Sequence, residues 1–186
     1  VFLSASARAC VEGVAAHDAF PVATSRGRLD VSCLVELVSR HPGDVEGYVA
    51  VTDPGWWKCL SREPGPKDAN FWRPSARPRR LATGTPFFFK LKAPYVKSAG
   101  FGYFAGFSVL PDWLAWDSFK LANGVASLEE LRSRLERIQI GARIEADPGG
   151  SIGCCLIAES VFFPEHDWVA APEDWSLRTQ SGARID

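Results

Sequence analysis

Two short aromatic segments carry the residue types that can hold a planar ligand. The first is Trp56-Trp57, and the second is the run NFWRPS at 70–75, which several arginines follow. Aromatic rings stack on nucleobases, a side-chain amide reads the hydrogen-bonding edge of a base, and arginines contact phosphates. The two segments together predict a site for an extruded or single-stranded nucleotide.

Other interpretations of these residues are open from the sequence. Trp56 and Phe71 can instead fill the end of a barrel-like core. Asp53 stands directly before Pro54, an arrangement typical of a helix N-cap, and can equally accept a hydrogen bond from a base amino group.

Residues for other chemistry are sparse. The five cysteines form no C-x-x-C pair, and Cys154 and Cys155 lie in an apolar run where we expect them to pack as small, reduced residues. The three histidines are isolated, so we predict no metal site. A G-x-S-x-G elbow is missing, and the glycine-rich segment Gly149–Gly153 does not end in the Lys and Ser/Thr of a phosphate loop. We therefore predict no catalytic centre and no cofactor; a hydrolase that uses Cys59 with His166 is the enzymatic alternative.

The composition excludes several classes of protein. The chain has 186 residues, of which 46% are hydrophobic and 23% charged, with a net charge of −1. These values favour one folded domain over a disordered chain, and no apolar run is long enough to span a membrane. The net charge argues against nucleic-acid binding through a bulk positive field. We expect a cytoplasmic protein that does not associate with a membrane.

Short strands interrupted by helices must position the candidate residues. We predict helices from Pro54 and over 111–121, the latter with Trp113, Leu114, Trp116 and Phe119 as its apolar stripe. A third helix begins at the capping box SLEE, with Leu128, Leu131, Leu135 and Ile138 as its buried stripe. A polar loop over 61–86 is expected to carry the run at 70–75. The predicted strands are 47–52, 87–91, 100–109, 151–159 and 161–163. Without regular β-α-β alternation, this order favours an α+β domain around a small curled β-sheet or barrel with flanking helices.

An ordered series of motifs runs from about residue 46 to 186. It includes GYVAVTD at 47–53 with Trp56, NFWRPS at 70–75 and GTPFFFKLKAP at 84–94. GYFA, LAWD, NG with ASLEE, IGC, FFP and DWS follow in the same order. As a series, these motifs resemble the N-terminal domain of predicted modification-dependent HNH restriction endonucleases of bacteria. Residues 1–43 lie outside the resemblance and are expected to form an N-terminal extension with short helices, which leaves 44–186 as the domain.

The resemblance implies a fold of the PUA superfamily, which includes EVE, YTH, ASCH and SRA-type readers, here of EVE or SRA type. It also implies a reader of double-stranded DNA that flips a modified cytosine, chiefly 5-methylcytosine, into an aromatic pocket. Trp57 stands where the resemblance implies a tyrosine. Because the sequence has no HNH motif, cleavage is expected on a missing C-terminal part or on a partner nuclease. The alternative is a PUA-like RNA- or nucleotide-binding protein without a role in restriction.

On this basis we assign two sets of site residues. Asp53 would accept from the cytosine amino group, and Asn70 or Ser75 would donate to the base. The predicted base pocket comprises Tyr48, Asp53, Trp56, Trp57, Asn70, Phe71, Trp72 and Ser75. The predicted phosphate contacts are Arg73, Arg77, Arg79, Arg80, Lys90 and Lys92.

Overall fold

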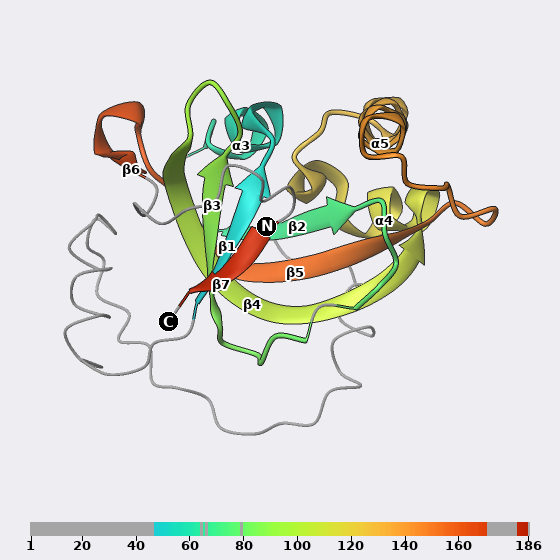
Figure 1. Cartoon of the computed structure of the whole chain (residues 1–186), viewed down its shortest axis with the longest axis horizontal. Helices are drawn as coiled ribbons and strands as arrows, with labels where there is room; N and C mark the ends of the chain where they lie inside the picture. The colour runs from blue at the N-terminus through green and yellow to red at the C-terminus, as the bar shows by residue number, and fades with distance from the viewer. Residues whose placement is uncertain (1–46, 64, 66, 79, 171–181, 186) are drawn as a thin grey trace.

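A curled β-sheet forms the body of the domain (Figure 1). The computed structural model describes residues 47–63, 65, 67–78, 80–170 and 182–185. The expected N-terminal extension, 1–43, lies outside the described residues. The sheet has seven strands in the order β2-β5-β4-β3-β1-β7, with β6 paired to β4. The strands are β1 (Gly47–Thr52), β2 (Lys67–Arg73), β3 (Pro86–Leu91), β4 (Lys97–Pro111), β5 (Ser151–Phe162), β6 (Val169–Ala170) and β7 (Gly182–Ile185).

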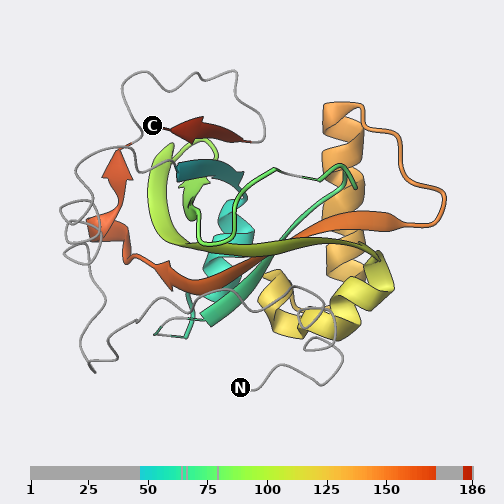
Figure 2. The same ribbon diagram turned by 90° about the horizontal axis from the view of Figure 1, so that it is seen from below.

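Among the described strands, only β1 and β3 pair in parallel. The long strands β4 and β5 pair over most of their length and interrupt the register at two bulges, which lets them bend across the domain (Figure 2). The sheet curls without closing, because β2 and β7 end the order on opposite sides. The predicted α+β class with a curled sheet is confirmed.

The helices begin where local sequence signals predict them. Helix α3 (Pro54–Leu60) has Asp53 as its N-cap, and α5 (Leu128–Ala142) has Ser127, whose hydroxyl accepts from the Glu130 amide. Leu131 and Leu135 of α5 are buried, as the predicted stripe requires. The other helical elements are α4 (Asp112–Phe119), η1 (Lys120–Asn123) and η2 (Glu165–Asp167).

Three local predictions are wrong. The segment expected to be one loop over 61–86 contains β2, which pairs antiparallel with β5. The two last strands expected over 151–163 are one strand, β5. Trp113 is 54% exposed rather than part of a buried stripe, because α4 buries Ala115, and residues two apart project to opposite sides of a helix.

Candidate functional site

A cavity of about 120 Å³ lies at the junction of strands β1, β2, β3 and β5 with helices α3 and α5. Each of these elements, or the residue just beyond its end, contributes to the wall. The lining residues are Tyr48, Val51, Asp53, Trp56, Phe71, Trp72, Arg73, Pro74, Phe87, Lys92, Ile138 and Cys155. Five of them belong to the predicted base pocket, namely Tyr48, Asp53, Trp56, Phe71 and Trp72. Arg73 and Lys92 belong to the predicted phosphate contacts.

Strand pairing explains why the aromatic rings meet. The parallel register of β1 and β3 sets Tyr48 opposite Phe87, and their ring centroids are 5.1 Å apart. Phe71 packs edge-on against Phe87 at 5.2 Å and against Trp56 at 5.4 Å. Such edge-to-face contacts hold the rings in fixed mutual orientations. The result is one continuous aromatic wall built from three strands and a helix.

The two indoles of this wall are anchored through their N–H groups. Trp56 is 3% exposed, and its Nε1 donates to the carbonyl of Asn70 at 3.3 Å; Trp72 is 8% exposed, and its Nε1 donates to the carbonyl of Asn123 at 2.8 Å. Both rings therefore belong to the hydrophobic core and also line the cavity. Because both indole N–H groups already donate hydrogen bonds to the backbone, the two rings can contact a ligand only through their faces and C–H edges.

Asn123 is the centre of a buried polar network that the sequence analysis did not identify. Its Oδ1 accepts from Asn70 Nδ2 at 2.9 Å, and its Nδ2 donates to the carbonyls of Ala115 and Lys120 at 3.1 and 2.9 Å. Asn70 Oδ1 is buried and has no hydrogen-bond partner among the described residues. This network connects β2 to η1 and so holds Trp72 in place.

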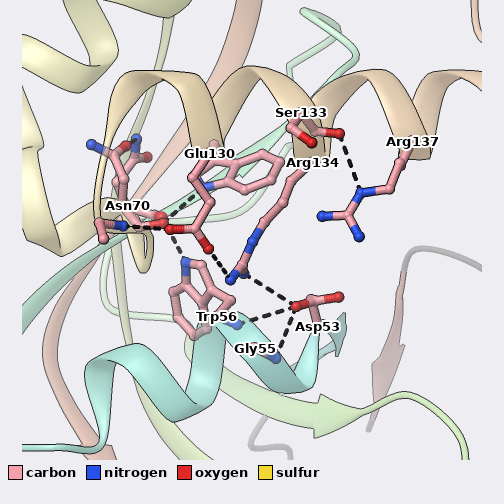
Figure 3. Close-up of polar contacts among 11 residues, drawn as sticks. Asp53, Gly55, Trp56, Asn70, Glu130, Ser133, Arg134 and Arg137 are labelled. Atoms are coloured by element: carbon pink, nitrogen blue, oxygen red, sulfur yellow. Dashed lines mark hydrogen bonds and ion pairs between the residues drawn. The ribbon is translucent and has the colours of Figure 1, made fainter.

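Asp53 caps α3, as one of its two interpretations predicts. Its Oδ1 accepts from the amides of Gly55 and Trp56 at 2.9 and 3.2 Å. The guanidinium of Arg134, on α5, lies 3.3 Å from the same oxygen (Figure 3). The cap does not remove Asp53 from the cavity, because its side chain is 46% exposed and lines the wall.

Three predicted pocket residues do not line the cavity. Trp57 donates to the carbonyl of Ala99 at 2.8 Å and packs edge-on against Trp168. Asn70 is fully buried in the network with Asn123. Ser75 lies in the connection after β2, where its hydroxyl accepts from the Arg77 amide.

The predicted phosphate contacts also separate. Lys90 is only 4% exposed, and strand alternation places it on the face of β3 opposite Phe87 and Phe89; burial lowers the pKa of its ammonium group. We therefore leave Lys90 out of the proposed phosphate contacts. Arg77 and Arg80 are exposed on the connection between β2 and β3. Arg79 lies outside the described residues.

Several lining residues escaped the sequence analysis because each had an ordinary packing role. The sequence predicts Phe87 in a strand and Ile138 in the apolar stripe of α5, and the structure places both residues accordingly. Cys155 is 1% exposed and stands opposite Phe71 in the β2–β5 register. Only that pairing, which joins residues far apart in the sequence, shows that these side chains share a wall.

The described residues contain neither a metal-ligating cluster nor a helix that could span a membrane. Among them, no three His, Cys, Asp or Glu side chains are grouped to hold a metal ion. None of the described helices is long and apolar enough to cross a membrane.

Burial raises the pKa of the Cys154 thiol to about 11, which disfavours the nucleophilic thiolate.

Comparison with solved structures defines the fold class. The crystal structure of ASCH from Zymomonas mobilis has a TM-score of 0.55 and 13% identity, over 77% of this chain and 90% of that chain. A tyrosine-to-phenylalanine variant of ASCH from the same organism gives a TM-score of 0.52 and 14% identity, over 74% and 90%. No family model and no curated protein matches the chain. The chain thus shares the fold of these ASCH structures, and the comparison gives no support to the EVE or SRA type or to an association with an HNH nuclease.

Proposed function

We propose that this chain is a nucleic-acid-binding module that reads a modified cytosine, 5-methylcytosine in particular, flipped from duplex DNA into the cavity beside Trp56. The observation that supports the proposal is the aromatic wall with two cationic residues, Arg73 and Lys92, in the same lining. In a restriction system, cleavage would then be supplied by a nuclease domain or partner.

The cavity is somewhat smaller than a cavity known to hold a single ring. An engineered apolar cavity of roughly 150 Å³ accommodates benzene, and the cavity here measures about 120 Å³. Extruding a base costs a few kcal/mol, and stacking on aromatic side chains returns about 1–3 kcal/mol per base. Val51, Ile138 and Cys155 provide apolar surface for a methyl group.

Local charge supplies the contacts with the nucleic-acid backbone. Lys92 makes no ion pair with the residues that the structure describes, and Arg77 and Arg80 extend the basic character along the β2–β3 connection. Each phosphate neutralised contributes about 0.9 to the slope of log affinity against log salt. We expect Lys92→Ala to reduce this slope by about 1 while preserving preference for the modified base.

The test is a titration at one salt concentration with three ligands of matched sequence: duplex DNA with 5-methylcytosine, unmodified duplex DNA, and RNA. The protein without substitutions should prefer the methylated duplex. Ile138→Trp, which places a bulky ring in the cavity lining, should remove this preference. Ile140→Trp is the matched control, because Ile140 lies on the same helix, is 72% exposed and does not line the cavity.

Two outcomes would contradict the proposal. Equal affinity of the protein without substitutions for the two DNA duplexes rules out a reader of modified cytosine. Tighter binding of RNA than of either duplex favours the RNA-binding alternative, for which the same cavity would hold an RNA base.

A further inference from the structure

Arg134 joins two carboxylates at the edge of the cavity. Its Nη1 lies 3.3 Å from Asp53 Oδ1, and its Nη2 lies 2.6 Å from Glu130 Oε1 (Figure 3). The side chain of Arg134 is 16% exposed. Arg134 also stands one helical turn before Ile138, which lines the cavity, so both project from the same face of α5. We call Asp53, Arg134 and Glu130 the carboxylate bridge.

The bridge is held in place from both ends. Glu130 Oε2 accepts from the Ala126 amide at 2.8 Å, which fixes the carboxylate at the start of α5. At the other end, Gly55 makes room for the guanidinium. A Cβ at this position would lie 3.0 Å from both Arg134 Nη2 and Asp53 Oδ1, closer than most such contacts. The sequence therefore leaves space for Arg134 to approach the N-terminus of α3.

The bridge leaves Asp53 with one carboxylate oxygen for a ligand. Oδ1 is engaged by the amides of Gly55 and Trp56 and by Arg134. Oδ2 makes no hydrogen bond with any described residue, although the side chain lines the cavity. A carboxylate oxygen only accepts hydrogen bonds, so it pairs with an amino group and is repelled by a carbonyl oxygen.

We propose that Arg134 is a positioning residue that sets which base edge the cavity accepts. By fixing Oδ1, it presents Oδ2 as the acceptor for an exocyclic amino group and excludes a base with a carbonyl at that position. The inference rests on the proposed function, since it concerns the same cavity. It adds that two residues of α5, Arg134 and Glu130, determine specificity without contacting the base themselves.

The experiment compares two short single strands that differ at one base. One carries 5-methylcytosine, with an exocyclic amino group, and the other carries thymine, which has the same methyl group and a carbonyl instead. A hydrogen bond to a charged group predicts that the folded chain prefers the 5-methylcytosine strand by about tenfold or more. Arg134→Gln should bring the affinity ratio close to one. Arg134→Lys should also lower it, because an ammonium does not reproduce the planar fork.

Matched variants separate positioning from stability. Arg132 lies on the same helix, pairs with Asp112 at 2.6 Å and does not line the cavity, so Arg132→Gln should keep the ratio. Asp53→Asn should retain the helix cap, because Asn caps as well as Asp, and should lower the ratio because the amide can also donate to a carbonyl. A purely structural role of Arg134 would weaken binding of both strands equally and leave the ratio unchanged.

The results distinguish this inference from the proposed function. An unchanged ratio in Arg134→Gln and Asp53→Asn overturns the inference, even when methylated duplex is preferred over unmodified duplex. A ratio that depends on Arg134, without any preference between the two duplexes, supports the inference and overturns the duplex reader. Failure of the folded chain to bind either strand overturns the inference, while the duplex titration still decides the proposed function.

Discussion

The buried network around Asn123 yields a quantitative test of how the cavity wall is held. Asn123→Ala removes three side-chain hydrogen bonds, which reach Asn70 Nδ2 and the carbonyls of Ala115 and Lys120. Each such bond contributes about 1 kcal/mol, and leaving buried partners unsatisfied adds to the cost. We expect the free energy of unfolding to fall by about 3 kcal/mol or more, a large share of the roughly 5–15 kcal/mol typical of a domain.

Urea denaturation, followed by tryptophan fluorescence and circular dichroism together, measures this loss. A double-mutant cycle with Asn70→Ala isolates the bond between the two side chains, for which we expect a coupling of about 1 kcal/mol. The carbonyl of residue 123, which accepts from Trp72, persists in Asn123→Ala, so the variant changes the side-chain network selectively. A loss below about 1 kcal/mol, or strictly additive single variants, would refute the reasoning.

Three further predictions concern the surroundings of the cavity. Gly124→Ala should destabilise the domain by about 2 kcal/mol or more in the same urea assay, because φ is +66° and the new Cβ would lie within the Trp56 indole; an unchanged midpoint would contradict this packing. The Glu130 pKa is lowered chiefly by the Ala126 amide, so its contribution to stability is present above the ordinary value of 4.5 and is lost as pH falls below it. A pH series of denaturation midpoints should therefore be flatter on the acid side in Glu130→Gln than in the unmodified chain. Cys154, with a pKa raised to about 11, should resist alkylation at pH 8 in the folded protein and react after denaturation, which peptide mapping detects.

The elements whose signals lie within a few neighbouring residues were predicted correctly. The strand Gly47–Thr52 is β1, and the capping box at Ser127 opens α5 with Leu131 and Leu135 buried. Both depend on residues close in sequence. By contrast, β2 was missed because a Pro-rich polar stretch surrounds it, and its strand conformation depends on pairing with β5, whose partner residues lie 80 to 93 positions away.

The sequence predicted four aromatic residues of the cavity lining, together with Asp53, Arg73 and Lys92. Tyr48, Trp56, Phe71 and Trp72 do line one cavity, but no local pattern separates them from Trp57, which packs elsewhere. The contact of Arg134 with Asp53 joins residues 81 positions apart and is a property of the folded chain. Likewise, Lys90 has the charge of a phosphate contact but stands in a buried strand position.

The most direct test of the central claim is whether the methyl group of the base enters the cavity. Isotope-filtered NMR of the complex, with a duplex whose 5-methylcytosine carries a labelled methyl group, detects protein protons close to that group. We predict nuclear Overhauser effects from the methyl group to side-chain protons of Val51 or Ile138, which provide the apolar surface assigned to it. Contacts only to other surfaces of the protein, or a methyl group that stays stacked within the duplex, would contradict the claim.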